Sequence, residues 1–312
     1  MSVSEGISVI VCSIHPEMAK DLQGNILSTC GVDTEFIIID NRHRGLSITA
    51  AYNEGAAKAK YDFLLFTHED VKWMCGGWGS KIIAKLKEKN TGAIGMAGSD
   101  IRLDAPSFHG WTSIRGREIT NYINTDTKHK RENDVTPLIM FRQGNRQGEK
   151  FRETVTLDGL TIFTRKEVWE KIPFDEKMVT GFHGYDIDFA LSLNHNGFHN
   201  FVWTDPEIYL WHFSKGSYDH NWYEDTLRLH NEKWHFMLPA LAGDAQLTEA
   251  EMQEATARCA FDFLKKGAKL RSIPDSDLFA LFKDYSNRYG FSSAMKNKFM
   301  RKYLWYRYMK KG

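Results

Sequence analysis

Phe63-Leu64-Leu65-Phe66-Thr67-His68-Glu69-Asp70 is the stretch of sequence that decides the fold. Its first four residues form an apolar run of the length expected for a strand buried inside a sheet. After Thr67 come His68 and Asp70, two potential cation ligands at positions i and i+2. In open α/β sheets, ligands bind outside the carboxyl ends of the strands. The position of His68-Glu69-Asp70 therefore indicates a ligand or metal site, provided that the surrounding chain builds such a sheet.

The sequence on either side alternates between apolar runs and amphipathic segments. Strands are predicted at residues 7–12, 36–39, 63–66 and 93–97, all of them buried, and helices at about 16–26, 47–60 and 78–86. This alternation predicts right-handed βαβ units and a mainly parallel sheet with helices on both faces. The predicted fold class is therefore α/β, and Asp40 and Asp70 lie at the carboxyl ends of two strands.

The remainder of the chain predicts a second, helical part. Residues 100–152 are polar with isolated aromatics, which favours a functional loop or an inserted lobe. Order returns at about residue 155, and Thr164 with Glu167 predicts a capped short helix. Beyond about Trp222 the chain is predicted to be entirely helical, with Thr248 and Glu251 as a second capping box. We expect a domain at 1–221 and a helical extension at 222–312.

Composition excludes several classes of protein. The 312 residues carry a formal net charge of +1, which argues against nucleic-acid binding by the molecule as a whole. The four cysteines lack CxxC spacing, which argues against a zinc knuckle or a disulfide scaffold. The sequence has no apolar run long enough to span a bilayer and no visible secretory signal. These features predict a cytoplasmic protein.

The order of motifs resembles a known family. Asp40-Asn41 ends one strand, Asn53-Glu54-Gly55 lies in the next helix, and His68-Glu69-Asp70 ends the following strand. This series resembles the family 2 glycosyltransferases of the GT-A fold, particularly their bacterial glycosyltransferase-like branch. The resemblance implies a Rossmann-like mixed, mainly parallel sheet flanked by helices. It also implies an Mn²⁺ or Mg²⁺ ion on Asp70, with His68 standing where the family usually has its first Asp.

The resemblance also assigns the donor site. Asp40 matches the position that contacts the nucleotide base. Beside it we expect donor contacts from residues at the ends of the first two strands, from the following helix and from a later basic segment: Cys12, Ser13, Asn41, Asn53 and Lys215.

Two later motifs extend the resemblance. Tyr185-Asp186-Ile187-Asp188-Phe189 stands where the family carries an acidic motif at the head of a helix near the acceptor. Asp186 matches the catalytic Asp, a base for the acceptor hydroxyl, whereas the alternative is a helix cap. His212 matches a histidine that returns to the metal or the diphosphate, and the alternative is a histidine packed between Trp211 and Phe213. Lys215 could neutralise the leaving diphosphate.

Three further features keep alternative interpretations. Asp158-Gly159 matches the floor of the family's donor and acceptor pocket, or forms a turn. Trp78 could stack on a sugar or pack in the core. The basic, aromatic segment 288–312 suits an anionic membrane surface or a helix packed on its own protein.

The resemblance implies an inverting transfer from a nucleoside-diphosphate sugar, with a uridine donor favoured, to a glycan or lipid-linked acceptor. Peripheral contact with the inner face of the membrane would fit a lipid-linked acceptor. One rival is a catalytically inactive sugar-binding protein of the same fold. Another is a sugar-phosphate nucleotidyltransferase, but Cys12-Ser13-Ile14-His15-Pro16 does not supply its Gly-rich loop.

Overall fold

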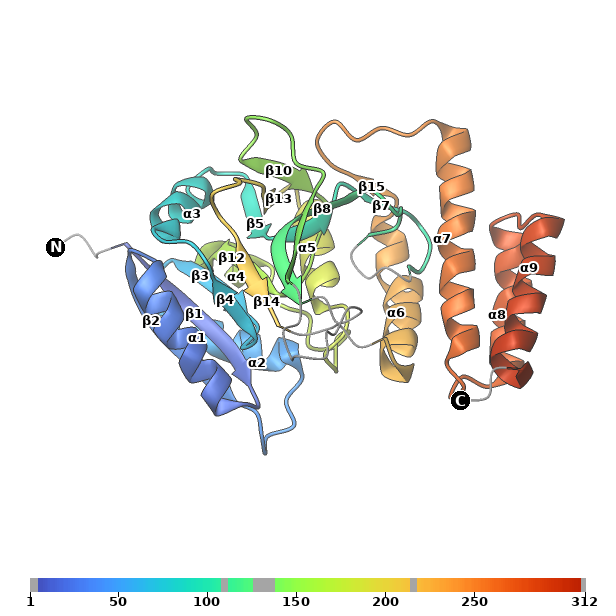
Figure 1. Ribbon diagram of the computed structural model, residues 1–312, viewed down its shortest axis with the longest axis horizontal. Helices are drawn as coiled ribbons and strands as arrows, with labels where there is room; N and C mark the ends of the chain where they lie inside the picture. The colour runs from blue at the N-terminus through green and yellow to red at the C-terminus, as the bar shows by residue number, and fades with distance from the viewer. Residues whose placement is uncertain (1–4, 108–111, 126–137, 214–217, 310–312) are drawn as a thin grey trace.

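The fold is built around a mixed seven-stranded sheet (Figure 1). The computed structural model describes residues 5–107, 112–125, 138–213 and 218–309. The strand order is β10-β13-β5-β12-β3-β1-β2. The strands are β1 (Gly6–Ser13), β2 (Asp33–Asp40), β3 (Phe63–Thr67), β5 (Thr91–Gly95), β10 (Phe151–Thr154), β12 (Thr161–Arg165) and β13 (His199–Trp203).

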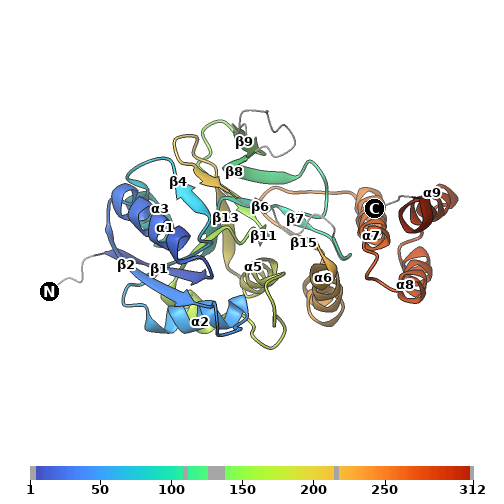
Figure 2. The same cartoon turned by 60° about the horizontal axis from the view of Figure 1, so that its bottom comes forward.

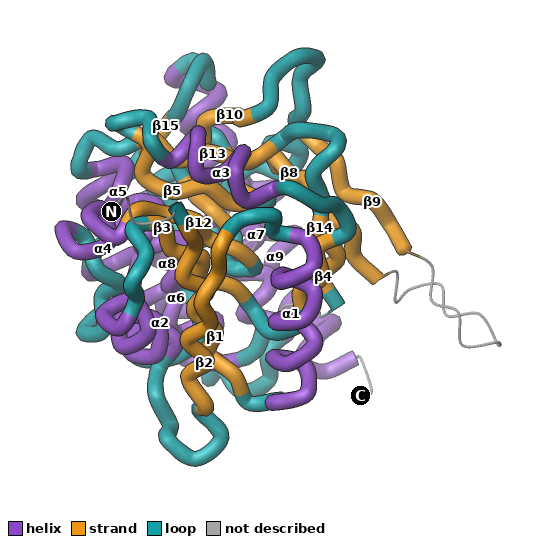
Figure 3. The backbone as a smooth tube through the Cα atoms, turned by 90° about the vertical axis from the view of Figure 1, so that its left-hand side faces the viewer, coloured by secondary structure: helices purple, strands orange, loops and turns teal. Residues whose placement is uncertain are grey.

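Strand directions confirm the predicted mainly parallel sheet. β1 is parallel to β2 and β3, β13 is parallel to β5, and β12 is antiparallel to both β3 and β5. β10 is antiparallel to β13. One prediction is wrong: β2 is an edge strand, viewed in Figure 3, and most of its residues are partly or fully exposed. Its apolar run predicts a buried strand, because the local pattern of a strand does not reveal whether neighbouring strands lie on both of its sides.

Helices cover both faces of this sheet (Figure 2). One hydrophobic cluster joins the sheet to α1 (Pro16–Thr29) and α3 (Trp78–Leu86). The other joins it to α2 (Ile48–Lys58), α4 (Lys166–Lys171) and α5 (Tyr185–His195). Each cluster excludes water from one face of the sheet, which is the main stabilising contribution of this layered arrangement.

The described residues between 100 and 152 contain several strands, where the sequence favoured a functional loop or an inserted lobe. A second sheet has the order β11-β6-β8-β14-β4, with β9 paired to β8. Its strands are β4 (Val71–Trp73), β6 (Ala97–Ser99), β8 (Glu118–Thr125), β9 (Leu138–Gln143), β11 (Thr156–Leu157) and β14 (Leu210–His212). The sequence prediction missed β8 and β9, because β8 pairs with β6 and β14, which lie far away in the chain, and local pattern does not reveal such pairing.

The C-terminal part is mostly helical and has its own core. It contains α6 (His220–Glu232), the 3-10 turn η1 (Trp234–Met237), α7 (Glu249–Lys269), α8 (Asp275–Arg288) and α9 (Ser293–Leu304), followed by a π-helical turn η2 (Trp305–Met309). It is not entirely helical, because β15 (Ala240–Leu241) pairs with β7 (Ile101–Arg102). Among the described residues, no helix is both long and apolar enough to cross a membrane.

The two predicted capping boxes have different outcomes. Thr248 and Glu251 form the reciprocal capping box that opens α7. The prediction for Thr164 and Glu167 is wrong, because α4 has Arg165 at its N-cap without a side-chain cap. The Thr164 hydroxyl instead donates to the Gly92 carbonyl at 2.7 Å, inside the sheet.

Candidate active site

Pairing between distant strands brings His212 to the segment that follows β3. β14 is antiparallel to β4, with His212 opposite Val71. The Phe213 amide donates to the Asp70 carbonyl at 3.0 Å. His68 and Asp70 lie in the connection between β3 and β4, so two β pairings hold them beside His212.

These three residues form a cluster that could hold a metal ion. One ligand atom from each of His68, Asp70 and His212 lies within 4.8 Å of the other two. His68 Nδ1 is 3.8 Å from Asp70 Oδ1, and His212 Nε2 is 3.5 Å from Asp70 Oδ2. The set of two imidazoles and one carboxylate suits Mn²⁺ or a softer divalent ion. His212 is therefore paired with Asp70, a contact that the packed-histidine interpretation does not include.

Tyr185 orients His68. The Tyr185 hydroxyl donates to the Gly159 carbonyl at 3.1 Å and lies 2.8 Å from His68 Nε2. When its proton goes to Gly159, the hydroxyl can accept from His68 Nε2–H, and this tautomer leaves the Nδ1 lone pair available to a cation beside Asp70. Burial, and then the charge of His212, lower the pKa of His68, which favours the neutral ligand form.

The Asp158-Gly159 turn lies at the centre of the site. The His68 amide donates to the Leu160 carbonyl at 3.2 Å, which joins the end of β3 to the start of β12. A Cβ on Gly159 would lie 1.9 Å from the Tyr185 hydroxyl, so this close approach needs glycine. The negative charge of Asp158 affects the pKa of His68, Asp186 and His212. The sequence left two interpretations of Asp158-Gly159 open, a pocket floor or a simple turn. The Asp-Gly pair directly before a buried strand was the signal that pointed to this position.

Asp186 enters the site from the first turn of α5. Its Oδ2 accepts from the Gly159 amide at 2.9 Å, which places it on the same turn as Tyr185 and His68. The N-cap of α5 is Gly184, with φ of 78°, so Asp186 is not the capping residue. A Cβ on Gly184 would also lie 2.6 Å from Leu229.

The electrostatics of the site favour proton exchange near neutral pH. Burial, followed by the charge of Asp158, raises the pKa of Asp186 to about 7. Burial lowers the pKa of His212, but its hydrogen bond to Asp70 and the charge of that carboxylate outweigh the effect and raise it. A carboxyl group with a pKa near neutrality is suited to general base chemistry.

Glu69 has a separate role, which sequence reasoning missed. Its carboxylate accepts from the Ser13 hydroxyl at 2.5 Å and from the amides of Ile14 and His15 at 3.1–3.3 Å. Glu69 therefore binds the start of α1 and fixes the connection between β3 and β4. An apolar-lined pocket of about 690 Å³ borders Glu69 and Phe213 on the α1 side.

The residues expected to bind the donor base lie side by side at the ends of β1 and β2. Ser13 pairs with Asp40, and the Asn41 amide donates to the Ser13 carbonyl at 2.8 Å. Asp40 is exposed, and its hydrogen bond with Arg42 lowers its pKa to about 2. The Asn41 side chain bonds both backbone groups of Leu46 and shapes the following loop. Cys12 is partly buried, and burial raises the pKa of its thiol to about 11.

The Asn53 side chain makes its hydrogen bonds with a different part of the protein. Its oxygen accepts from the Trp169 indole and the Phe174 amide, and its nitrogen donates to the Phe174 carbonyl and to Glu176. The amide is thus used within the protein, where it joins α2 to the segment after α4. Lys215 lies outside the described residues.

Two other sequence alternatives are decided by packing. Trp78 is 0% exposed and stacks on Trp73 with ring centroids 4.3 Å apart, so it belongs to the core and not to a sugar site. Asp188 binds Lys233 and the Trp234 indole at 2.9–3.1 Å, which agrees with its expected structural role.

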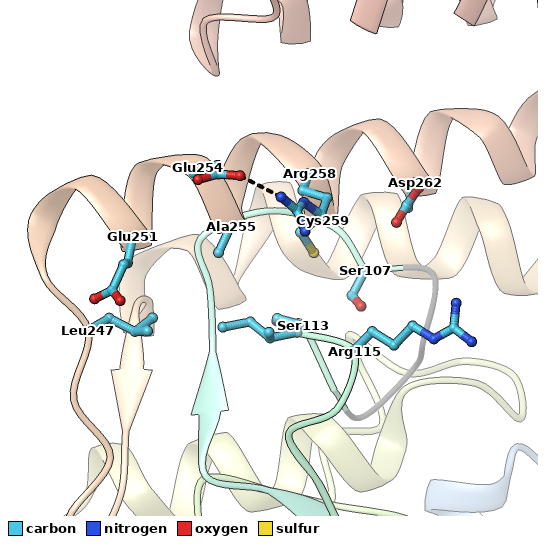
Figure 4. A pocket seen from close by; sticks show the side chains of 11 residues that line it. Ser107, Ser113, Arg115, Leu247, Glu251, Glu254, Ala255, Arg258, Cys259 and Asp262 are labelled. Atoms are coloured by element: carbon cyan, nitrogen blue, oxygen red, sulfur yellow. Dashed lines mark hydrogen bonds and ion pairs between the residues drawn. The ribbon is translucent and has the colours of Figure 1, made fainter. Parts of the chain in front are cut away.

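A second pocket, of about 250 Å³, lies beside α7 (Figure 4). Its lining includes Ser107, Arg115, Arg258 and Cys259, and the Glu254 carboxylate is paired with Arg258. None of the expected catalytic, metal or donor residues that the structure describes lines this pocket. The chemistry expected from the sequence is therefore concentrated at the carboxyl end of β3.

The class that this fold and site define is the GT-A glycosyltransferase. The sequence matches the model of a glycosyltransferase-like family over residues 8–233. The chain belongs to this glycosyltransferase-like family and is a transferase. No curated protein matches its sequence.

The chain is similar to solved structures at low sequence identity. GalNAc-T7, in a crystal structure with UDP, GalNAc and Mn²⁺, has a TM-score of 0.50 and 9% identity, over 96% of this chain and 56% of that chain. The chain thus spans just over half of that relative's length. TarS 1-349 from S. aureus with UDP-GlcNAc has a TM-score of 0.49 and 12% identity, over 98% and 93% of the two chains.

Proposed function

We propose that this protein transfers a sugar from a nucleoside-diphosphate sugar, of the uridine class, to a hydroxyl of a glycan or lipid-linked acceptor, with inversion at the anomeric carbon. The observation that carries the proposal is the convergence of His68, Asp70 and His212 with Asp186 around the Asp158-Gly159 turn. A cation-binding set and a carboxyl group of raised pKa thus share one small site.

The residues of the first cluster fit the divalent ion that the fold implies. His68 would contribute Nδ1, Asp70 a carboxylate oxygen and His212 Nε2, all of them partly buried. Mn²⁺ or Mg²⁺ bound there would stabilise the negative charge of the departing diphosphate. Tyr185 would hold the His68 ring in the orientation that presents Nδ1.

The chain's own groups perform the remaining tasks. Asp186 takes the proton of the acceptor hydroxyl as that oxygen attacks the anomeric carbon and the bond to the diphosphate breaks. Asp40, with Cys12, Ser13 and Asn41 beside it, binds the nucleoside. Lys215 neutralises the diphosphate. For Asn53 we propose a structural role, because its amide already makes four hydrogen bonds in the protein.

A panel of nucleotide sugars tests the proposal. Full-length protein with Mn²⁺ should release nucleoside diphosphate from one of them, and NMR of the product should show an inverted anomeric centre. Asp186→Asn should abolish release while the donor still raises the melting temperature, since a ligand that binds the folded state stabilises it. Asp277→Asn is the matched control, because Asp277 also lies in the first turn of a helix but is exposed, in α8.

The outcomes separate enzyme from binder. Donor binding without turnover by the unaltered protein would favour the catalytically inactive alternative. Binding of no nucleotide sugar, with or without Mn²⁺, would contradict both interpretations. Retention of turnover by Asp186→Asn would refute the assignment of the base.

We also propose that the end of the chain contacts a membrane surface near a lipid-linked acceptor. α9 packs through Phe299 and Tyr303 in the C-terminal core. The following residues expose large apolar side chains, with Trp305 at 49% and Met309 at 67%. Apolar and aromatic side chains beside lysines and arginines suit the interface of an anionic bilayer.

A further inference from the structure

A second group of potential metal ligands lies away from the candidate active site. Asp104 follows β7, His230 lies in the last turn of α6, and His235 belongs to η1. One ligand atom from each of the three lies within 4.8 Å of the other two. The transfer chemistry proposed above uses none of them.

The carboxylate of Asp104 is the point on which both imidazoles converge. Its Oδ1 is 2.7 Å from His235 Nδ1 and 3.5 Å from His230 Nε2. Neighbouring ligands around a tetrahedral ion with bonds of ~2.0–2.1 Å lie roughly 3.3 Å apart. Small side-chain adjustments would therefore place the three atoms around one ion.

His230 is the observation that points to a ligand. Its side chain is 0% exposed, and neither ring nitrogen has a hydrogen-bond partner among the residues that the structure describes. Buried polar atoms are normally satisfied by protein, water or an ion. His199 provides a contrast, because it is exposed and pairs with Glu153 at 2.6 Å.

Positively charged side chains near the cluster affect the pKa of His230. Burial, followed by the charges of Arg102, Arg288 and His235, lowers the pKa of His230 to about 3. Neutral imidazole is the form that binds metals. The Arg102 guanidinium carbon lies 5.5 Å from the Trp234 ring, and Arg288 approaches from α8.

Arg288 competes with Asp104 for the same atom, Nδ1 of His235. Its Nη2 is 3.2 Å from His235 Nδ1 and 3.9 Å from Asp104 Oδ2. His235 Nδ1 cannot donate to the carboxylate and accept from the guanidinium at once. With an ion on Nδ1 and Asp104 Oδ1, Arg288 would turn to Asp104 Oδ2 or to solvent, since its side chain is 36% exposed.

We propose that Asp104, His230 and His235 form a second metal site, for a borderline divalent ion of the Zn²⁺ or Co²⁺ type. Two imidazoles favour such ions over Mg²⁺ or Ca²⁺, which prefer oxygen ligands. The bound ion would link α6 and η1 to the loop after β7. It also steadies α5, because Lys233 and Trp234 between the two histidines hold Asp188.

The test uses full-length protein with Asp70→Asn, which removes the carboxylate shared by the first cluster. This protein is titrated with Co²⁺, and then with Zn²⁺ as a competitor. We expect one equivalent of Co²⁺, visible d–d absorption that Zn²⁺ abolishes, and a higher melting temperature with metal. Adding His235→Gln should weaken Co²⁺ binding more than tenfold and remove the absorption band.

Two controls keep the test decisive. His199→Gln in the same background removes an imidazole paired with a carboxylate, and it should bind Co²⁺ as before. Asp104→Asn, which preserves side-chain size, carries the test if His235→Gln fails to fold. If Asp70→Asn protein binds no Co²⁺, or if the cluster variants bind it as well as His199→Gln does, the three residues are an ordinary ion-pair network and the proposal is wrong.

Discussion

At the scale of the residue, the hydroxyl of Tyr185 decides how His68 can act. It joins the segment proposed to bind metal to the turn at Gly159 and to the helix that carries Asp186. Partners of this kind orient metal-binding histidines, and their loss typically weakens metal binding about 10–100-fold. Tyr185 is thus a positioning residue.

Tyr185→Phe should weaken Mn²⁺ binding about tenfold, because the His68 ring loses the partner that fixes its tautomer. Titration of Mn²⁺ followed by electron paramagnetic resonance measures this directly. Tyr223→Phe is the control, since Tyr223 is also buried, lies in α6, and its hydroxyl has no hydrogen-bond partner among the described residues. Equal Mn²⁺ affinity of the two variants would show that the His68–Tyr185 contact does not matter.

Transfer should depend on pH through Asp186, whose pKa is raised to about 7. A base must be ionised to accept a proton, so kcat should fall about tenfold per unit as pH decreases below 7. A flat profile between pH 5 and 7, with chemistry rate-limiting, would contradict this assignment.

The same group should affect stability in the opposite sense. Between its ordinary value of 3.8 and about 7, Asp186 holds a proton in the folded state that the unfolded chain has released. Stability therefore falls as pH rises through this window, by at most about 1.4 kcal/mol per unit. Without metal, Asp186→Asn should melt higher than the unaltered protein at pH 8, and the gain should vanish near pH 4.

At the scale of the element, the site depends on how closely α5 approaches the start of β12. Gly159 allows that approach, and Gly184 allows the turn into α5. The pairing of β4 with β14 supplies His212 from the other side. Movement of α5 or β14 would therefore displace the side chain that it carries from the site, although the sequence of the site would be unchanged.

Gly159→Ala should displace Tyr185 and lower transfer at least tenfold, since its Cβ would lie 1.9 Å from the Tyr185 hydroxyl. Steady-state kinetics and Mn²⁺ affinity together measure the effect. Gly24→Ala, in α1, is the control, because its Cβ meets nothing within 4 Å. That change should stabilise the protein by about 0.5–1 kcal/mol through helix propensity. Full activity of Gly159→Ala would mean that the turn tolerates movement.

At the scale of the whole molecule, the C-terminal helices are continuous with the transferase domain. Their core includes Ile101 and Leu103 from the β7 region as well as residues of α7–α9. β15 also pairs with β7. The described part of the segment 288–312, residues 288–309, is thus anchored at Phe299 and Tyr303, and its exposed apolar side chains begin at Leu304.

The protein should bind vesicles that contain anionic lipid, and binding should decrease with salt because exposed charges are screened. Trp305→Ser should reduce sedimentation with such vesicles several-fold. Leu27→Ser, on α1, is the control for an equally exposed apolar residue, at 60% exposure. No sedimentation of the unaltered protein at low salt would exclude the proposed membrane contact.

The sequence by itself determined the βαβ start of the fold and the positions of Asp40 and Asp70 at strand ends. It could do so because strand and helix periodicities are local properties of the chain. The resemblance to a family added Asp186 and His212. The tertiary structure decided the rest: the edge position of β2, the second sheet to which residues 100–152 contribute β8 and β9, the contact of Tyr185 with His68, and the meeting of Asp104 with two histidines. Each of these depends on pairing between residues far apart in the chain, and local pattern carries no information about which distant segment completes a contact.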